Sequence, residues 1–148
     1  MRSRPLRSGQ HSSGSYNPAG WHNANSTTAW VQDSTLDAAV KAELDVQEPC
    51  LALVSFGFHA HLPGAASYAG YASVSMAGAS RRDPIASSAE PLSLLLICDT
   101  PGRQESVTKV AHLPINAGAT KFNLRFRTDV ASAGIFQVKD VWIQAQVA

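Results

Sequence analysis

The run CLALVSFGFHAHL at positions 50–62 constrains the fold more than any other part of the sequence. If the run is a strand, successive side chains point to opposite sides of it. One side then carries mainly apolar residues: Cys50, Ala52, Val54, Phe56, Phe58, Ala60 and Leu62. The other side carries Leu51, Leu53, Ser55, Gly57, His59 and His61. We therefore expect a long strand whose first face lies in a core.

A second alternating run, TKFNLRFRT, occupies positions 120–128. Its apolar side consists of Phe122, Leu124 and Phe126. Its polar side consists of Lys121, Asn123, Arg125 and Arg127. The period of two residues predicts a half-buried strand that presents its arginines outward.

Further strand signals fill the rest of the chain at short intervals. They are YAGYASVSMAG, the buried strand LSLLLIC, ESVTKVAHLPI and a long or bulged closing strand, IFQVKDVWIQAQV. STLDAAVKAELDV fits both periods, and we expect a short helical turn followed by a strand. Strands at this spacing, joined by Gly/Pro turns, predict an all-β protein, either a sandwich or a barrel.

The first 28 residues form a different kind of segment, rich in Ser, Gly, Asn and Arg and without an apolar period. We expect residues 1–28 to be an extended N-terminal docking arm and residues 29–148 to be the β-sandwich domain. Tyr16 and Trp21 have no local core to enter, so we expect them to be buried in a partner. The alternative is that the arm folds back on its own domain.

Charge is distributed unevenly along the chain. Arg2, Arg4 and Arg7 give the arm a charge of +3, and the remaining nine Lys/Arg against eleven Asp/Glu leave −2 elsewhere, for a net charge of +1. We expect these arginines to meet acidic groups of a partner, and the low net charge argues against nucleic-acid binding. No apolar run is long enough to span a membrane. No apolar segment follows the basic N-terminus, so we expect synthesis in a reducing cytoplasm.

No residue pattern indicates catalysis or a cofactor. His59 and His61 share a strand face and could bind a metal ion if a third ligand, such as His112 or a carboxylate, came from a neighbouring strand. The alternative is that they are two polar residues on a solvated face or at an interface. We expect no metal. Cys50 and Cys98 stand beside apolar runs, which favours buried thiols over a disulfide, although spacing does not exclude the disulfide. We therefore expect no enzyme activity.

Two features are candidates for partner binding. Lys121, Arg125 and Arg127 form a basic stripe that is either an ordinary solvent face or a contact for acidic groups of another subunit. Trp142 faces away from Val141 and Ile143, and it could cover the sandwich edge, bind a ligand or lie at a subunit interface. We favour the interface, because aromatic residues are enriched there.

The C-terminal third, HLPINAGATKFNLRFRTDVASAGIFQVKDVWIQAQV, resembles the closing strands of small jelly-roll virion proteins of tailed bacteriophages. Capsid decoration proteins and tail-fibre heads are the types that it resembles. The resemblance implies a jelly-roll-like β-sandwich with a non-enzymatic structural role, in a virion assembled from proteins made in the host cytoplasm. The implied partners are copies of itself, a trimer being one form, and a major capsid or other virion protein. A capsid decoration or cement protein is the favoured function. A tail or baseplate component and a carbohydrate-binding module are the alternatives.

Overall fold

The computed structural model describes residues 10–25, 28–30, 32–63, 68–85, 90–98, 102–129 and 135–148. Strands dominate these residues, with one short helix near the N-terminal end. The elements are β1 (His11–Tyr16), β2 (His22–Asn25), α1 (Ser34–Ala39), β3 (Lys41–Val46), β4 (Cys50–Leu62), β5 (Tyr68–Gly78), β6 (Ser93–Cys98), β7 (Arg103–Ile115), β8 (Gly118–Thr128) and β9 (Phe136–Val147).

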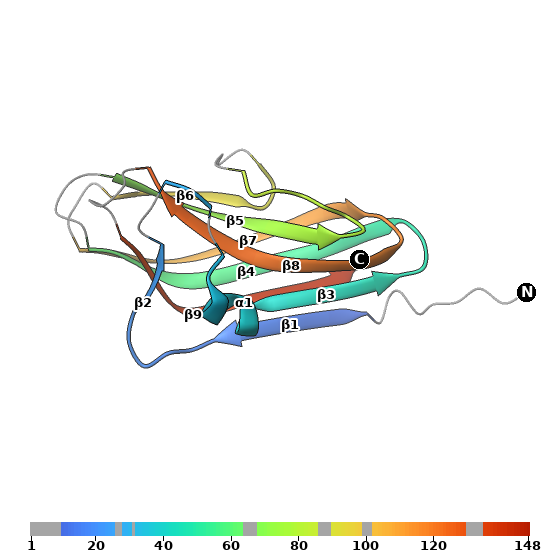
Figure 1. Ribbon diagram of the computed structural model, residues 1–148, viewed down its shortest axis with the longest axis horizontal. Helices are drawn as coiled ribbons and strands as arrows, with labels where there is room; N and C mark the ends of the chain where they lie inside the picture. Colours follow the sequence, from blue (N-terminus) through green and yellow to red (C-terminus); the bar gives the residue numbers. More distant parts are fainter. Residues whose placement is uncertain are drawn as a thin grey trace, which may run out of the picture.

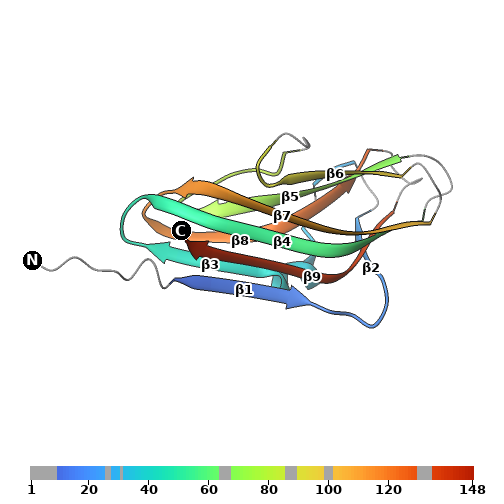
Figure 2. The same ribbon diagram turned by 180° about the vertical axis from the view of Figure 1, so that it is seen from behind.

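Two antiparallel sheets lie face to face (Figure 1 and, from behind, Figure 2). The first sheet has the order β1-β9-β4-β7, and the short β2 also pairs with β9. The second sheet has the order β3-β8-β5-β6. From β2 onward, each strand lies in the opposite sheet from the strand before it, except that β5 and β6 are neighbours in the second sheet. This crossing between two sheets is the topology of a jelly roll. The expected all-β, jelly-roll-like sandwich is therefore confirmed.

The core lies between the sheets and is formed by the apolar faces that the sequence predicts. The even-numbered side chains of β4 beyond Cys50 are buried, as are Phe122, Leu124 and Phe126 of β8. Near one end, the rings of Phe58 and Phe126 meet edge to face, with centroids 5.2 Å apart, and the centroid of Phe136 lies 5.0 Å from that of Phe126. Aromatic pairs in this geometry stabilise a core beyond their buried area.

The ambiguous segment at 34–46 divides as expected. Ser34–Ala39 forms α1, which buries Leu36, and Lys41–Val46 forms β3, which pairs with β8. The side chain of Asp33 accepts hydrogen bonds from the backbone N–H groups of Thr35 and Leu36, at 3.0 Å each. This N-cap satisfies donors that the helix leaves open, so the helix begins at Ser34.

In the part of the predicted arm that the structure describes, the chain folds back on its own domain, which was the alternative to docking on a partner. His11–Tyr16 and His22–Asn25 are strands that pair with β9 of the same chain. A polar segment can be held in this way, because the backbone hydrogen bonds of a strand do not require apolar side chains. The sandwich therefore includes β1 and β2 and does not begin at residue 29. Residues 1–9, with Arg2, Arg4 and Arg7, lie outside the described residues.

LSLLLIC forms β6, but Ile97 is 56% exposed because β6 is the last strand of its sheet. Cys50 is a free thiol that is only half-buried, since it lies at the start of β4; the side chain of Cys98 is outside the described part. The closing strand is bulged, as expected: Asp140 has φ of 51°, and the pairing of β9 with β4 shifts between Gly57 and His59.

Candidate functional site

Trp21 and Tyr16, expected to anchor the arm in a partner, make their contacts within this chain. The ring of Trp21 stacks on His59 at 5.9 Å between centroids and lies tilted on His61 at 4.9 Å. The Nζ of Lys139 stands 4.5 Å from the centre of the same indole ring. Tyr16 packs against the core and meets the ring of His22 edge to face, at 5.4 Å. The two aromatic residues thus hold the N-terminal segment against its own sandwich.

The two histidines expected to share a face of β4 do so, and each has a polar partner. His61 Nδ1 donates to Gln137 Oε1 at 2.8 Å, and Gln137 in turn donates to Asn23 Oδ1 at 2.6 Å. His59 is hydrogen-bonded to the hydroxyl of Ser106 on β7. Among the described residues, no group of three His, Cys, Asp or Glu is arranged to hold a metal ion. These contacts give the histidine pair a structural role under Trp21.

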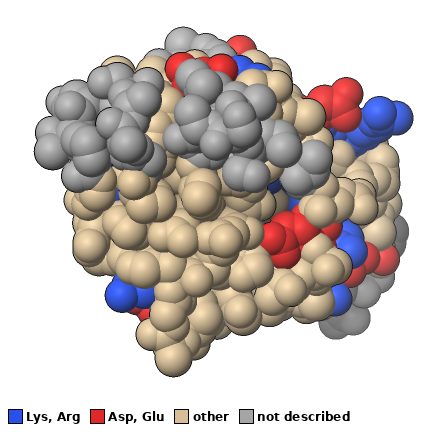
Figure 3. All heavy atoms as spheres, turned by 60° about the vertical axis from the view of Figure 1, so that its left-hand side comes forward, with Lys and Arg blue, Asp and Glu red and all other residues tan. Residues whose placement is uncertain are grey.

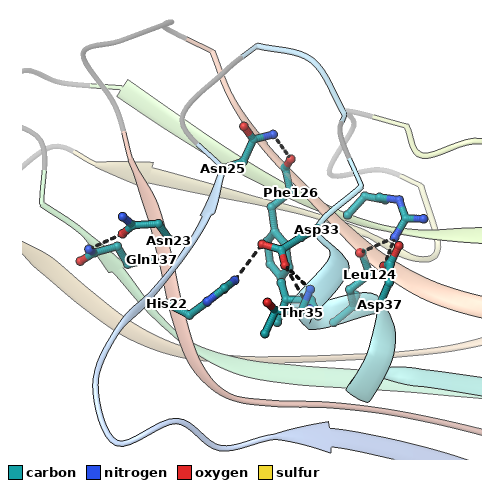
Figure 4. A network of polar contacts seen from close by, with 11 residues as sticks. His22, Asn23, Asn25, Asp33, Thr35, Asp37, Leu124, Phe126 and Gln137 are labelled. Carbon is teal, nitrogen blue, oxygen red and sulfur yellow. Dashed lines mark hydrogen bonds and ion pairs between the residues drawn. The ribbon is translucent and has the colours of Figure 1, made fainter.

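A second polar network joins the N-terminal strands to α1 (Figure 4). His22 Nε2 donates to Asp33 Oδ2 at 2.7 Å, while the other oxygen of Asp33 caps the helix. Asn25, which is buried, donates to the carbonyl of Phe126 at 2.6 Å. The network therefore connects β2, the helix and β8 through side chains far apart in the sequence.

Replacing Asp33 by alanine is expected to lower the free energy of unfolding by about 1–2 kcal/mol, because the change removes the helix cap and the partner of His22. Asp33→Asn keeps an N-cap acceptor and should cost well under half as much. Urea unfolding of the two variants beside the unchanged protein measures the difference. Equal losses for Ala and Asn would show that the cap does not carry this contribution.

The predicted basic stripe points outward on β8 but is engaged with the chain's own groups. Arg125 Nη1 lies 2.5 Å from Asp37 Oδ1 of α1, and both side chains are mostly buried. The guanidinium of Arg127 lies between two aromatic rings, 4.7 Å from the centre of Tyr71 and 5.7 Å from that of Trp30. Lys121 faces Glu43 across the β3–β8 pair. Arg125 is therefore neutralised by an ion pair within the chain, and the guanidinium of Arg127 is held there by aromatic rings.

Trp142 lies on the outer face of the first sheet, in register with Gly57 of β4 and Ser15 of β1. A Cβ atom at Gly57 would stand 2.6 Å from the indole nitrogen of Trp142. The glycine thus lets the indole ring lie down on the sheet, and the ring is half-buried. Of the roles open to this residue, covering the sheet is the one that this contact supports.

The same outer face carries an unusual array of uncharged residues. Three successive rows cross all four strands β1, β9, β4 and β7 without a Lys, Arg, Asp or Glu. They are His11, Gln146, Leu53 and His112; Ser13, Gln144, Ser55 and Val110; and Ser15, Trp142, Gly57 and Thr108. Leu51 and Pro114 extend the array on β4 and β7. We call these fourteen residues the neutral face.

Two large aliphatic side chains of the neutral face are open to solvent: Leu51 is 51% exposed and Val110 57%. Leu51 and Leu53 could be assigned to an outer face from the sequence alone, but Val110 could not, because its position depends on the pairing of β7 with β4. Exposed aliphatic residues grouped on one uncharged surface are typical of protein contact sites. The neutral face is therefore the candidate functional site.

Charged side chains are also few on the side of the molecule seen in Figure 3. In the view of Figure 3, acidic and basic side chains occupy small separate areas, and most of the described surface is uncharged. Among the residues that the structure describes, no helix has the length and apolarity needed to cross a bilayer.

The comparisons with known proteins concern the fold. No family model matches the sequence, and no characterised protein is significantly similar to it in sequence. The chain is similar in structure to Eiger TNF from S. frugiperda, with a TM-score of 0.55 and 11% identity, over 93% of this chain and 91% of that one. It also aligns with murine APRIL, with a TM-score of 0.46 and 11% identity, over 94% of this chain and 100% of that one. At such low identity, the first similarity shows a shared jelly-roll fold and nothing about activity.

Proposed function

We propose that this protein is a non-enzymatic structural component that associates with copies of itself through the neutral face. The observation that carries the proposal is the exposure of Leu51 and Val110 on a sheet surface without charged side chains. Burying aliphatic side chains between copies removes apolar area from water, which favours association.

A second copy is the partner that fits this surface best. Two neutral faces from two copies can pack together without repulsion between like charges. A partner with a charged surface would find no ion pair on the neutral face. The four strands and three rows span roughly 20 Å in each direction, or roughly 400 Å². Stable interfaces commonly bury about 800 Å² per partner, so a single contact of this size is weak. Weak contacts of this kind gain strength when many copies are held on one particle.

A virion is the particle that we propose, and capsid decoration is the favoured role. The support is the resemblance of residues 112–147 to the closing strands of phage jelly-roll proteins, together with the jelly-roll fold. Arg2, Arg4 and Arg7, beyond the described residues, are proposed to meet acidic groups of the underlying capsid protein. A tail or baseplate position would use the same surfaces and is the alternative.

We do not extend the proposal to carbohydrate binding, which would require an aromatic ring free to stack on a sugar. Trp21 lies on two histidines, Trp30 contacts Arg127, and Trp142 covers Gly57. All three indole side chains are only partly exposed.

Val110→Glu tests the self-association. Sedimentation velocity of the unchanged protein, from micromolar to near-millimolar concentration, is expected to show reversible association. The variant should weaken it by at least about tenfold, because burial of an unpaired carboxylate is costly. Ile97→Glu is the matched control, since Ile97 is equally exposed but lies on the second sheet.

Two results would contradict self-association through the neutral face. In one, Ile97→Glu weakens association as much as Val110→Glu does. In the other, the unchanged protein stays monomeric at every concentration. Binding of the protein to purified capsids that lack it tests the virion role separately. Weaker capsid binding by Val110→Glu, with unchanged binding by Ile97→Glu, is the expected result, because the variant loses only the contacts between neighbouring copies.

A further inference from the structure

The two sides of the sandwich, where the edges of the sheets lie, differ in how they are covered. On one side the N-terminal segment covers the edge strand β3. Gln10 Oε1 accepts the backbone N–H of Asp45 at 3.0 Å, and Ser12 Oγ accepts that of Glu43 at 2.9 Å. On the other side lies β7, a strand of 13 residues at the end of the first sheet. Among the described residues, no strand pairs with its outer edge, so β7 offers backbone donors and acceptors to a further strand.

The pairing of β4 shows which residues of β7 turn their backbone groups outward. The backbone N–H of Ala148 donates to the carbonyl of Leu51 at 3.0 Å, so Leu51 turns its backbone groups towards β9. On β7 it faces Pro114, which has no N–H to donate and turns away from β4. Backbone groups alternate in direction along a strand. The outward donors and acceptors of β7 therefore belong to Gln104, Ser106, Thr108, Val110 and His112.

A second copy of β7 can pair with this edge in antiparallel orientation about a twofold axis at Val107. Gln104 of one copy then lies opposite Val110 of the other, and Ser106 lies opposite Thr108. All four residues turn their backbone groups outward, so these are the pairs that exchange backbone hydrogen bonds. The two Val107 residues face one another on the axis, in a pair without hydrogen bonds between its own backbone groups.

The charged residues of β7 favour this register. Glu105 of one copy lies opposite Lys109 of the other, and the twofold axis makes this contact twice. Lys109 is half-buried and has no ion-pair partner among the described residues. Glu105 Oε2 accepts a bond from Arg103 Nη2 at 3.0 Å, and a carboxylate has a second oxygen for Lys109. Sliding one copy by two residues would place Lys109 opposite Arg103 or opposite Val107, with repulsion or no ion pair.

We propose that two copies of this protein pair through β7 in this register and form one continuous sheet. The pairing uses backbone groups and not the neutral face, but its role, to join two neutral faces, rests on the proposed function. Residues opposite one another in paired strands point to the same side of the sheet, so the two neutral faces become neighbours. Together they cover roughly 800 Å², the area that a stable interface commonly buries on one partner. The edge contact alone buries few apolar side chains, so we expect it to be weak.

A disulfide across the twofold axis detects such a weak contact. In a variant with Cys50→Ala and Cys98→Ala, Val107→Cys places two thiols in a pair whose Cα atoms are about 4.5 Å apart, which a disulfide can span. We expect a covalent dimer on mild oxidation, seen on a non-reducing gel. Ser106→Cys is the matched control. It is more exposed than Val107, but in this register the two copies of residue 106 are about 7–8 Å apart, so it should cross-link at least about tenfold more slowly.

Charge reversal tests the register. Added to Val107→Cys, Lys109→Glu places like charges opposite one another twice and should slow cross-linking about tenfold, and further addition of Glu105→Lys should restore most of the rate. Equal rates for Val107→Cys and Ser106→Cys, or a Lys109→Glu effect that Glu105→Lys does not rescue, would overturn the proposal.

Val110→Glu separates this contact from the neutral face. Its side chain meets the uncharged Gln104 in the β7 pairing, so we expect the Val107→Cys rate to stay within about twofold. Cross-linking that persists while sedimentation shows no association would support the β7 contact and contradict only the contact between neutral faces.

Discussion

Phe136→Ala is expected to lower the free energy of unfolding by about 4 kcal/mol, because it removes a large, fully buried ring from the centre of the aromatic cluster. Phe136 has no exposed surface, and its ring lies against Phe58 and Phe126. Gly70 approaches it so closely that a Cβ there would stand 2.6 Å from the ring. Neighbours held by two sheets cannot close fully over the space that the smaller side chain leaves.

Urea or thermal unfolding of the purified variant measures this loss. Ile97→Ala is the matched control, since it shortens an aliphatic side chain that is mostly exposed and should change stability by no more than about 0.5 kcal/mol. A loss below about 1 kcal/mol for Phe136→Ala would contradict the position of this residue in the core.

Gly14→Ala is expected to cost about 3 kcal/mol, although it adds only one methyl group. A Cβ atom at this position would stand 2.6 Å from the carbonyl oxygen of Lys41 and still closer to that of Ala39. These are backbone atoms at the junction of α1 and β3, so no side chain can rotate away to make room. The strand β1 would have to move off this junction and loosen its pairing with β9.

Gly20→Ala provides a matched control in the same N-terminal segment, because nothing lies within 4 Å of the added atom. It should leave stability within about 0.5 kcal/mol of the unchanged protein. Comparing Gly14→Ala with Gly20→Ala also shows whether the N-terminal segment lies on its own sandwich or on a neighbouring subunit. If residues 11–16 docked only on a neighbouring subunit, dilute Gly14→Ala protein would unfold at the same urea concentration as the control.

Much of the sandwich can be predicted from local patterns because burial of one face imposes a period of two on a strand. The runs that form β4 and β8 alternate clearly, and their inward residues are those of the core. The helix-to-strand change at α1 and β3 is also visible in the sequence, since Asp33 supplies a cap and the residues from Val40 to Val46 then alternate.

Local patterns could not place β1, β2 or the neutral face, because these depend on which strands become neighbours. HSSGSY carries no apolar signal, since β1 is an edge strand held by backbone pairing and by the close approach that Gly14 permits. Arg125 meets Asp37, 88 residues away in sequence, only because α1 packs beside β8. Val110 joins Leu51 and Leu53 on one surface only through the register of β7 with β4. The sequence by itself determined which side of each strong strand is apolar; the tertiary structure decided which outward residues share a surface, because that follows from long-range pairing and not from the period along any one strand.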